Sequence, residues 1–432
     1  MNRLALAPTP GPVTALRALG ALLRGRDLLP PLAAFHADLG DIFRLPLPNF
    51  SPVVLAGPAA ARLVLVDAEH NFRSRIDTDP VAHLLRHGVL VADGAAHAAL
   101  RELMAPALHR RLMEQQVQMM VACADEAAQG WPLGQPLDLR LEMRRLALRV
   151  LTRAVFGVDI APDLARLWGP ILRSLDFISP GAWLVWPAVP RPGYGRALRE
   201  LDDYLYQLIA ARRAQPAGGE DLLSLLVGAG LSDDLIRDQL LTLLIAGHDT
   251  AAATLTWAWQ ALAEHPDMLR RAQAEARAVL GDAPPTAANL GQLTYLEQVL
   301  KEVWRLYPPI HVANRLAARE VAFGGRRIPA GSRVLFSIFL TQRDPRHWSE
   351  PERFDPERFN GSIQPAPFTY LPFGAGPRVC IGAAMAQVEA KAVLARLLQT
   401  LDLSLQPAPP GLRMRATLEL AGGVFAEVSK KA

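Results

Sequence analysis

The chain has 432 residues, of which 50% are hydrophobic and 20% charged, and this describes a globular protein with a sizeable core. Its net charge of +4 is too small for a nucleic-acid-binding protein, and no run of arginines resembles a basic arm. Two cysteines cannot form a disulfide framework, so a reducing compartment, the cytoplasm, is expected.

The first 27 residues, MNRLALAPTPGPVTALRALGALLRGRD, are mildly apolar, but prolines and arginines interrupt them repeatedly. The segment falls well short of the roughly 20 apolar residues that a membrane span needs. It also lacks the order of a signal peptide, which is a basic start, an apolar centre and a small-residue cleavage site. We therefore expect neither a membrane span nor secretion.

Short apolar runs at residues 41–47 and 51–57 predict strands, and the pattern from about 97 to 230 is mostly helical. Residues 177–195, with four prolines and two tryptophans, predict an apolar loop. An unbroken helix is expected from Ser232 to Pro266, and its length of roughly 50 Å would cross the whole domain.

Strands return at residues 321–339, where Gly324–Gly325 predicts a hairpin turn, and a second hairpin is expected around Gly422–Gly423. We predict one domain over residues 1–432, mainly α with a minor antiparallel β portion. The β-containing parts are expected at about 40–70, 315–340 and 411–428, and the helical body at about 97–310 and 380–402.

The centre of the long helix, LLIAGHDTAAATL, carries one glycine, Gly247, and two polar residues, Asp249 and Thr250, in an apolar stretch. One interpretation is a close helix crossing at Gly247, with the Thr250 hydroxyl bonded to a carbonyl of its own helix. The other is a groove for a small ligand, flanked by an acid and a hydroxyl that pass protons. The pattern alone leaves both open.

Two further motifs follow the long helix. In LEQVLKEVWRLYPP, Glu302 and Arg305 share one helical face, which is typical of an ordinary surface ion pair. Residues 343–359, RDPRHWSEPERFDPERF, contain two overlapping Pro-Glu-Arg-Phe units. Their density of proline, aromatic and arginine residues indicates an ordered loop, although a repetitive surface loop has the same composition.

The stretch LPFGAGPRVCIGAAMA places Cys380 in a loop stiffened by glycines and a proline. Such a cysteine could be an inert buried thiol, a nucleophile or a metal ligand. A zinc site needs further cysteines or histidines, and none is nearby in the sequence. A single thiolate can bind a haem iron, because the porphyrin supplies four other ligands.

These motifs together resemble the cytochrome P450 family. FGAGPRVCIG fits the family's Phe-x-x-Gly-x-Arg-x-Cys-x-Gly signature at Phe373, Gly376, Arg378, Cys380 and Gly382. AGHDT resembles its oxygen-activating helix motif, EVWR its Glu-x-x-Arg motif and FDPERF its Pro-x-Arg-Phe motif, in the family's order. The resemblance covers nearly the whole chain and implies the P450 fold, with a long central helix.

The resemblance implies a role for each matching residue. Cys380 would be the axial ligand of the iron in heme b (iron protoporphyrin IX), and Asp249 and Thr250 would be catalytic, supplying protons on the distal side. The other cofactor-binding residues would be His97, Arg101, Ala246, Gly247, Arg315, Phe373, Arg378 and Gly382. Glu302, Arg305 and Arg358 would form a structural ion-pair triad.

The implied reaction inserts one oxygen atom from O2 into a C–H or C=C bond of an apolar small molecule. Two electrons would come from a separate ferredoxin or flavodoxin-type protein, for which Arg110 and Arg111 are docking candidates or ordinary solvated charges. The enzyme is expected to be a monomer. Alternatives are a peroxide-using or electron-independent haem-thiolate enzyme, a haem-binding sensor or carrier, and a cysteine hydrolase.

By the same resemblance, the substrate pocket would draw on the segment after Phe72, on residues 177–195, where Trp183 and Trp186 flank the entrance or pack in the core, and on single positions further along. Those positions are Leu243, Ala246, Ile310, His311, Val312, Ala313 and Val424. Most are apolar, which favours a terpenoid, a steroid or a fatty acid.

Overall fold

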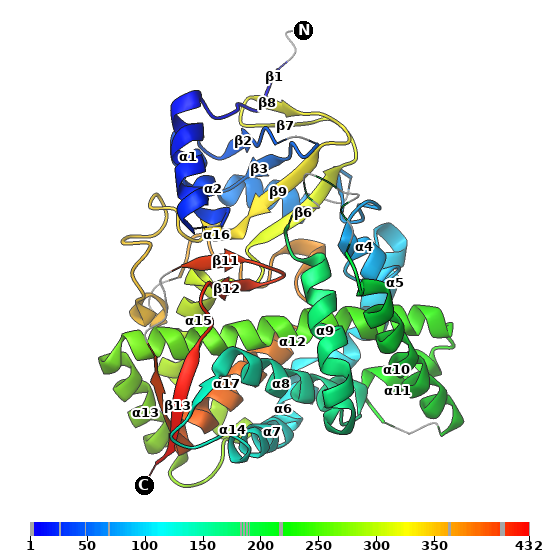
Figure 1. Cartoon of the computed structure of the whole chain (residues 1–432), viewed down its shortest axis with the longest axis vertical. Coiled ribbons are helices and arrows are strands. Elements are labelled where there is room, and N and C mark those ends of the chain that lie inside the picture. Colours follow the sequence, from blue (N-terminus) through cyan, green and yellow to red (C-terminus); the bar gives the residue numbers. More distant parts are fainter. Residues whose placement is uncertain are drawn as a thin grey trace.

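Helices fill most of the computed structural model, and a β-rich region lies at the end that carries the N-terminus (Figure 1). The structure describes residues 4–25, 27–47, 49–67, 70–181, 184, 186, 189, 191–215, 219–361, 364–406 and 411–431. Trp183, one of the two expected entrance tryptophans, lies outside these residues. The mainly α fold predicted from the sequence is confirmed.

The α-helices are α1 (Pro12–Gly25), α2 (Leu29–Leu39), α3 (Pro58–Ala61), α4 (Pro80–Leu85), α5 (Gly94–Met104), α6 (Arg110–Gln115), α7 (Val117–Gln129), α8 (Leu139–Leu151), α9 (Leu164–Ile178), α10 (Tyr194–Ala214), α11 (Leu222–Gly228), α12 (Asp233–Glu264), α13 (Pro266–Leu280), α14 (Ala287–Leu290), α15 (Thr294–Leu306), α16 (Ile338–Thr341) and α17 (Ala383–Thr400). The strands are β1 (Ala5–Leu6), β2 (Ile42–Arg44), β3 (Val53–Leu55), β4 (Phe72–Arg73), β5 (Pro136–Asp138), β6 (Val312–Ala317), β7 (Val321–Phe323), β8 (Arg326–Ile328), β9 (Arg333–Ser337), β10 (Leu401–Leu405), β11 (Leu412–Met414), β12 (Leu418–Leu420) and β13 (Phe425–Lys430).

The long helix predicted from the sequence is α12, whose 32 residues cross the helical body (Figure 1). Ser232 caps it, because its hydroxyl accepts the Leu235 N–H at 3.3 Å, and acidic residues in the first turn suit the helix dipole. It ends at Glu264, one residue before His265–Pro266, where proline removes a backbone donor. Most of its residues are buried on all sides, as expected of a helix in the centre of a large core.

The β-rich region holds a five-stranded sheet of order β2-β3-β9-β6-β4 and a three-stranded sheet of order β1-β8-β7. The hairpin predicted at Gly324–Gly325 is confirmed, since β7 and β8 pair antiparallel across these two glycines, both at positive φ. Two pairings, β3 with β9 and β1 with β8, are parallel, so this part is mixed.

The hairpin expected around Gly422–Gly423 is wrong. β12 pairs antiparallel with β11, while β13 pairs with β10 and β5 in a different sheet. The two glycines therefore lie in a connection between sheets. Two adjacent glycines favour a turn locally, but the pairing of β12 and β13 with different strands determines the path of the chain.

One large hydrophobic core joins the helical body, including α12 and α17, and two smaller cores lie under the sheets of the β-rich region. The loop that carries Cys380 enters α17 directly, so the largest core fixes its C-terminal side. No helix within the described ranges combines the length and the apolar character of a membrane span.

Candidate functional site

The loop before Cys380 is held by backbone contacts that only glycine permits. Gly376 has φ +67°, and a Cβ atom there would lie 2.3 Å from the carbonyl oxygen of Leu65. The Cys380 N–H donates to the Phe373 carbonyl at 2.8 Å, which closes the loop. These contacts fix where the cysteine sits before any cofactor is considered.

Cys380 itself is exposed, yet protein surrounds its thiol closely enough that burial raises the thiol pKa above its ordinary value. Two features oppose this effect and favour the thiolate: the Gly382 N–H donates to the sulfur, and the charge of Arg101 is nearby. An accessible thiol with an N–H donor and a cation beside it suits a metal-ligating cysteine better than an inert core residue. The other cysteine, Cys123, is fully buried.

Three arginines from distant segments gather on the same side of the molecule as this loop. Arg101 on α5 donates to the Val379 carbonyl at 2.6 Å, and Arg378 donates to the Asp93 carboxylate at 2.6 Å. The Arg315 guanidinium on β6 makes one hydrogen bond within the described residues, from Nη1 to the carbonyl of Asn314 at 2.8 Å. Its Nε has no partner among them. Burial first, and then the charge of Arg378, lower the pKa of Arg315 to about 10.

His97 on α5 lies next to these cations. Its pKa is lowered to about 4, first by burial and then by the charges of Arg378 and Arg101. Buried positive charge without enough negative charge is unfavourable by itself. A dianionic group such as the two propionates of haem would balance it, so the residues present fit this cofactor.

On α12 the structure shows the less specific of the two interpretations raised by the sequence. The helix is continuous, and the Thr250 hydroxyl donates to the Ala246 carbonyl at 2.8 Å. A Cβ at Gly247 would lie 2.9 Å from Cδ1 of Leu151, so α12 packs closely against α8 here and a larger residue would require Leu151 to move. Ala246 and Gly247 are half-buried, so this stretch of α12 is partly open on one side.

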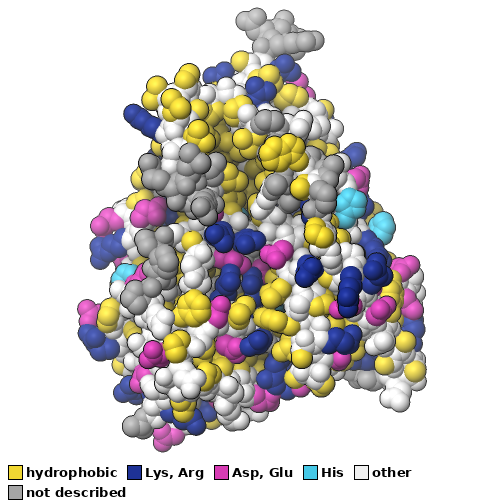
Figure 2. Space-filling model, viewed as in Figure 1, with side chains coloured by type: hydrophobic (Ala, Val, Ile, Leu, Met, Phe, Trp, Pro, Cys, Tyr) yellow, Lys and Arg dark blue, Asp and Glu magenta, His cyan; other side chains and the backbone are white. Residues whose placement is uncertain are grey.

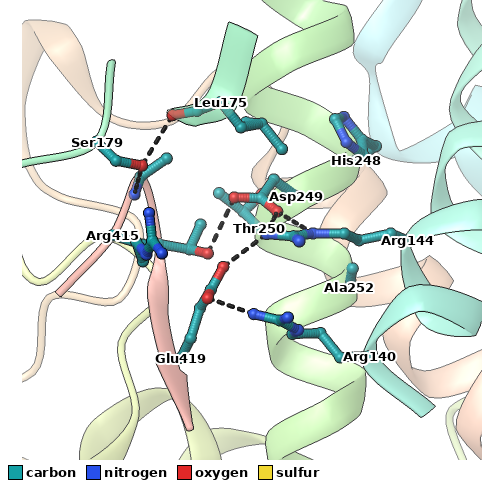
Figure 3. Close-up of polar contacts among 12 residues, drawn as sticks. Arg140, Arg144, Leu175, Ser179, His248, Asp249, Thr250, Ala252, Arg415 and Glu419 are labelled. Atoms are coloured by element: carbon teal, nitrogen blue, oxygen red, sulfur yellow. Dashed lines mark hydrogen bonds and ion pairs between the residues drawn. The ribbon is translucent and has the colours of Figure 1, made fainter. Parts of the chain in front are cut away.

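Asp249 lies within a buried polar network rather than free beside Thr250 (Figure 3). Its Oδ1 accepts a hydrogen bond from Nε of Arg144 on α8 at 2.7 Å, and its Oδ2 accepts one from the Thr417 hydroxyl at 2.9 Å. Burial alone would lower the pKa of Arg144, but Asp249 and Glu419 raise it above its ordinary value, so the guanidinium stays charged.

The three residues of the expected ion-pair triad lie together. Glu302 and Arg305 are fully buried and form a two-pronged pair at 2.6 and 2.8 Å, and Arg358 Nε lies 3.4 Å from Glu302. Arg305 also donates to the backbone carbonyls of Gln342, Pro351 and Arg353, so it fastens the loop of residues 343–359 to α15. The surface-pair interpretation is therefore excluded by burial.

The residues expected to line the substrate pocket differ widely in burial. Leu243, His311 and Val424 are buried, Val312 and Ala313 are partly buried on β6, and Ile310 is 43% exposed. Burial lowers the pKa of His311 to about 4, so this side chain is neutral near pH 7. Trp186, 65% exposed, is not a core residue.

Arg110, one of the two candidate docking residues, is part of local contacts: it donates to Gln387 at 2.7 Å and lies 3.7 Å from Glu114. Arg111 is exposed. These observations place two cations at the surface of α6, a helix that packs against α17.

Sequence reasoning missed the partners that hold the site residues. Asp93 pairs with Arg378, and Arg144, Thr417 and Glu419 surround Asp249. One signal was available for Arg144, because it lies within the predominantly buried pattern of LEMRRLALRVL. The residues Thr417 and Glu419 carry no such signal, since their position depends on a hairpin distant in sequence.

Comparisons with known proteins identify the family of the chain. The sequence model of the family described as Cytochrome P450 matches residues 10–420. The chain is 34% identical over 426 residues to Putative cytochrome P450 139 of Mycobacterium tuberculosis, covering 93% of this chain and 97% of that one. It is 34% identical over 382 residues to Putative cytochrome P450 137 of the same species, covering 83% and 76%.

Among solved structures, the chain is similar to one titled "Retinoic acid bound cyanobacterial CYP120A1", with a TM-score of 0.86 and 26% sequence identity over 99% of this chain and 100% of that one. The family match and the curated relatives cover nearly the whole sequence, and the fold is the same. The chain therefore belongs to the cytochrome P450 family of haem b-dependent monooxygenases.

Proposed function

We propose that this enzyme inserts one oxygen atom of O2 into a C–H or C=C bond of an apolar small molecule and releases the second atom as water. Two electrons come from a separate ferredoxin or flavodoxin-type protein, and two protons complete the balance. The observation that carries this proposal is the accessible Cys380 thiol beside an incompletely balanced cluster of arginines.

In this proposal the Cys380 sulfur would bind the haem iron, and Arg101, Arg315, Arg378 and His97 would hold the propionates. When bound, the haem supplies the site where dioxygen is reduced, and its thiolate ligand favours O–O cleavage. Among the described residues the Nε of Arg315 has no partner, and this supports its role, because a carboxylate would complete a buried guanidinium with an unused donor.

Residues around the sulfur tune it and limit its access to water. The Gly382 N–H and the charge of Arg101 stabilise the thiolate, against the burial that favours the thiol. Phe373, which stacks edge-on against Trp304 with ring centroids 5.1 Å apart, supports the loop from the side of α15. A Cβ at Gly382 would lie 3.9 Å from the sulfur, an ordinary van der Waals distance, so the contribution of Gly382 is its backbone N–H rather than its missing side chain.

Ala246 and Gly247 would lie beside the bound haem, and Thr250 and Asp249 would move protons there. The Thr250 hydroxyl donates to a carbonyl of its own helix and keeps an acceptor position, so it can relay a proton when that bond opens. Asp249 is the acid or base that returns a proton to the Thr250 hydroxyl. Its carboxylate is held in place by Arg144 and Thr417. Glu302, Arg305 and Arg358 act only in holding the loop.

The substrate is proposed to be an apolar, middle-sized molecule such as a terpenoid, a steroid or a fatty acid. It would contact Leu243, Ala246, Val424 and the segment from Ile310 to Ala313, most of which are apolar. The structural relative is titled with retinoic acid bound, a largely apolar molecule with one carboxylate, and this supports the same class. We also propose a monomer with one domain that acts in the cytoplasm.

The Cys380→Ala variant tests the proposal directly. It should lose the absorption band that carbon monoxide gives with thiolate-ligated ferrous haem, because the ligand atom is gone. Cys123→Ala is the matched control: it removes the only other cysteine, which is buried on α7, and should keep the band. Survival of the band in Cys380→Ala would refute the assignment of the axial ligand.

A panel of apolar compounds then narrows the substrate. Compounds that bind next to the iron should shift the haem spectrum from low to high spin, and product analysis of those compounds with O2 and an electron donor identifies the oxidised position. Turnover without any electron donor or with peroxide alone would favour the alternative chemistries.

A further inference from the structure

The hairpin of β11 and β12 contributes two side chains to the network around Asp249 (Figure 3). Thr417, just before β12, donates its hydroxyl to Asp249 Oδ2 at 2.9 Å. Glu419, on β12, accepts a hydrogen bond from Nη2 of Arg144 at 2.6 Å and pairs with Arg140 on its other oxygen. The hairpin is thus one wall of the site that holds Asp249.

Arg144 is shared between two carboxylates. Its Nε and Nη2 contact Asp249 Oδ1, both at 2.7 Å, and Nη2 also reaches Glu419. All three side chains are at least nine-tenths buried. With Arg140 the network has two positive and two negative groups, so removal of one carboxylate leaves buried charge unbalanced.

The turn of the same hairpin, next to Thr417, is anchored to the end of α9. The Ala416 N–H donates to the Ser179 hydroxyl at 2.9 Å, which in turn donates to the Leu175 carbonyl at 2.8 Å. Arg415 pairs with Asp176 at 3.2 Å. Charged side chains of both signs gather over this hairpin on the face shown in Figure 2. The hairpin therefore connects the end of α9 with the centre of α12.

We propose that Glu419 and Thr417 are positioning residues for Asp249, and that the β11–β12 hairpin sets how firmly this carboxylate is held. The inference rests on the proposed role of Asp249 in proton movement. Glu419 acts through Arg144, because Nη2 of that guanidinium, which contacts Asp249, also donates to Glu419. Thr417 acts directly, since among the described residues it is the donor found on Oδ2.

The two residues predict distinguishable effects. Without the charge of Glu419, Arg144 acts on Asp249 alone and holds it more tightly, so proton movement slows. Without the hydroxyl of Thr417, Oδ2 loses a donor and the carboxylate is free to rotate away from its position. A hairpin that served stability alone would change neither proton movement nor the environment of Asp249 once the protein is folded.

The test uses the holoenzyme with a compound that gives the spin shift. Glu419→Gln and Thr417→Val should each lower the product formed per pair of electrons by about tenfold, a part of the hundredfold or more that a positioned acid or base contributes. Glu419→Gln should also enlarge the solvent isotope effect on turnover, because proton movement becomes slower. Glu419→Asp, which restores the charge, should recover part of the loss.

Matched controls come from positions of the same chemistry outside the network. Glu427 is exposed on β13, and the Thr256 hydroxyl donates to the Ala252 carbonyl of its own helix. Glu427→Gln and Thr256→Val should both behave as the parent enzyme.

A readout independent of turnover is the infrared carboxylate band of Asp249, identified by subtracting the spectrum of Asp249→Asn. This band should shift in Thr417→Val, which loses a hydrogen bond, and stay in place in Thr256→Val. Thr417→Val also keeps the size and charge of the side chain, so it decides the question if Glu419→Gln does not fold.

The outcomes separate the two hypotheses. Normal coupling of electrons to product in Asp249→Asn would overturn the proposed role of Asp249 itself. A defect in Asp249→Asn together with parent-like coupling, isotope effect and infrared band in Glu419→Gln and Thr417→Val would overturn the positioning role alone.

Discussion

At the scale of single residues, replacement of Gly376 or of Gly374 should destabilise the protein for two different reasons, steric contact with backbone and backbone strain. Both have positive φ, +67° and +72°, but only at Gly376 would a Cβ approach backbone, 2.3 Å from Leu65 O. Gly374→Ala should cost about 1 kcal/mol through backbone strain. Gly376→Ala should cost more, about 3 kcal/mol, because backbone must move.

Chemical denaturation of the two holoenzyme variants measures this difference. Gly376→Ala should also weaken the thiolate haem spectrum, since the loop that places Cys380 is displaced. Equal losses of unfolding free energy in both variants would contradict the steric explanation.

His311 predicts a pH dependence of stability. Burial lowers its pKa to about 4 from the ordinary 6.5, so below pH 6.5 the unfolded chain takes up a proton that the folded chain does not. The contribution is fully present above pH 6.5 and falls, by at most about 3 kcal/mol, as the pH drops to 4.

The measurement compares the free energy of unfolding in urea at pH 7 with that at pH 5. His311→Gln should lose less stability than the parent enzyme between these two values, because glutamine does not titrate. An identical loss in both proteins would show that His311 is not buried in its neutral form.

At the scale of elements, the crossing of α12 and α8 predicts a coupling between Gly247 and Leu151. A Cβ at Gly247 would lie 2.9 and 3.1 Å from the two methyl carbons of Leu151. Overpacking of this kind costs about 1–3 kcal/mol, against a gain of about 1 kcal/mol from the helix propensity of alanine. Gly247→Ala should therefore be neutral to destabilising, and less harmful in a Leu151→Ala background.

A double-mutant cycle of unfolding free energies measures this coupling. Strict additivity would mean that Gly247 is not needed for the crossing. In that case its proposed place beside the cofactor would be the remaining explanation for a glycine in the middle of a long helix.

Pairing between distant elements also marks the limit of sequence analysis. The motifs around Cys380, Thr250 and Glu302 are local, so their chemistry could be predicted from the order of residues. The partners of Asp249 come from α8 and from the β11–β12 hairpin, 105 and 168 residues away, and no local pattern specifies such contacts.

The error at Gly422–Gly423 has a similar physical origin. A glycine pair favours a tight turn, but the strands on either side satisfy their backbone groups with other partners, β12 with β11 and β13 with β10 and β5. For Gly247, the sequence allowed two interpretations, close helix packing or a groove for a ligand. They differ in what lies beside the glycine, and the spacing of residues could not identify its neighbour Leu151.

At the scale of the whole molecule, the proposed redox partner predicts a dependence on ionic strength. If an acidic ferredoxin docks near α6, reversal of both charges in Arg110→Glu/Arg111→Glu should slow reduction about tenfold or more at low salt. Screening should bring variant and parent together at high salt.

Stopped-flow reduction across a salt series measures this effect. Arg319→Glu, an exposed position between β6 and β7 in the β-rich region, is the control for a change of net charge elsewhere. Parent-like rates for the double variant at every salt concentration would place the docking surface away from α6.

The Nε of Arg315 has no hydrogen-bond partner among the described residues, and this affects the newly made chain before haem binds. Arg315 is brought beside Arg378 by the folding of β6 and of the Cys380 loop, two segments about 60 residues apart that repel each other through these charges. Before the carboxylates of the cofactor bind, this junction holds two like charges with Asp93 as a nearby negative charge. Haem supply during synthesis should therefore raise the resistance of the folded chain to proteolysis, and limited proteolysis of apoprotein and holoenzyme measures this difference.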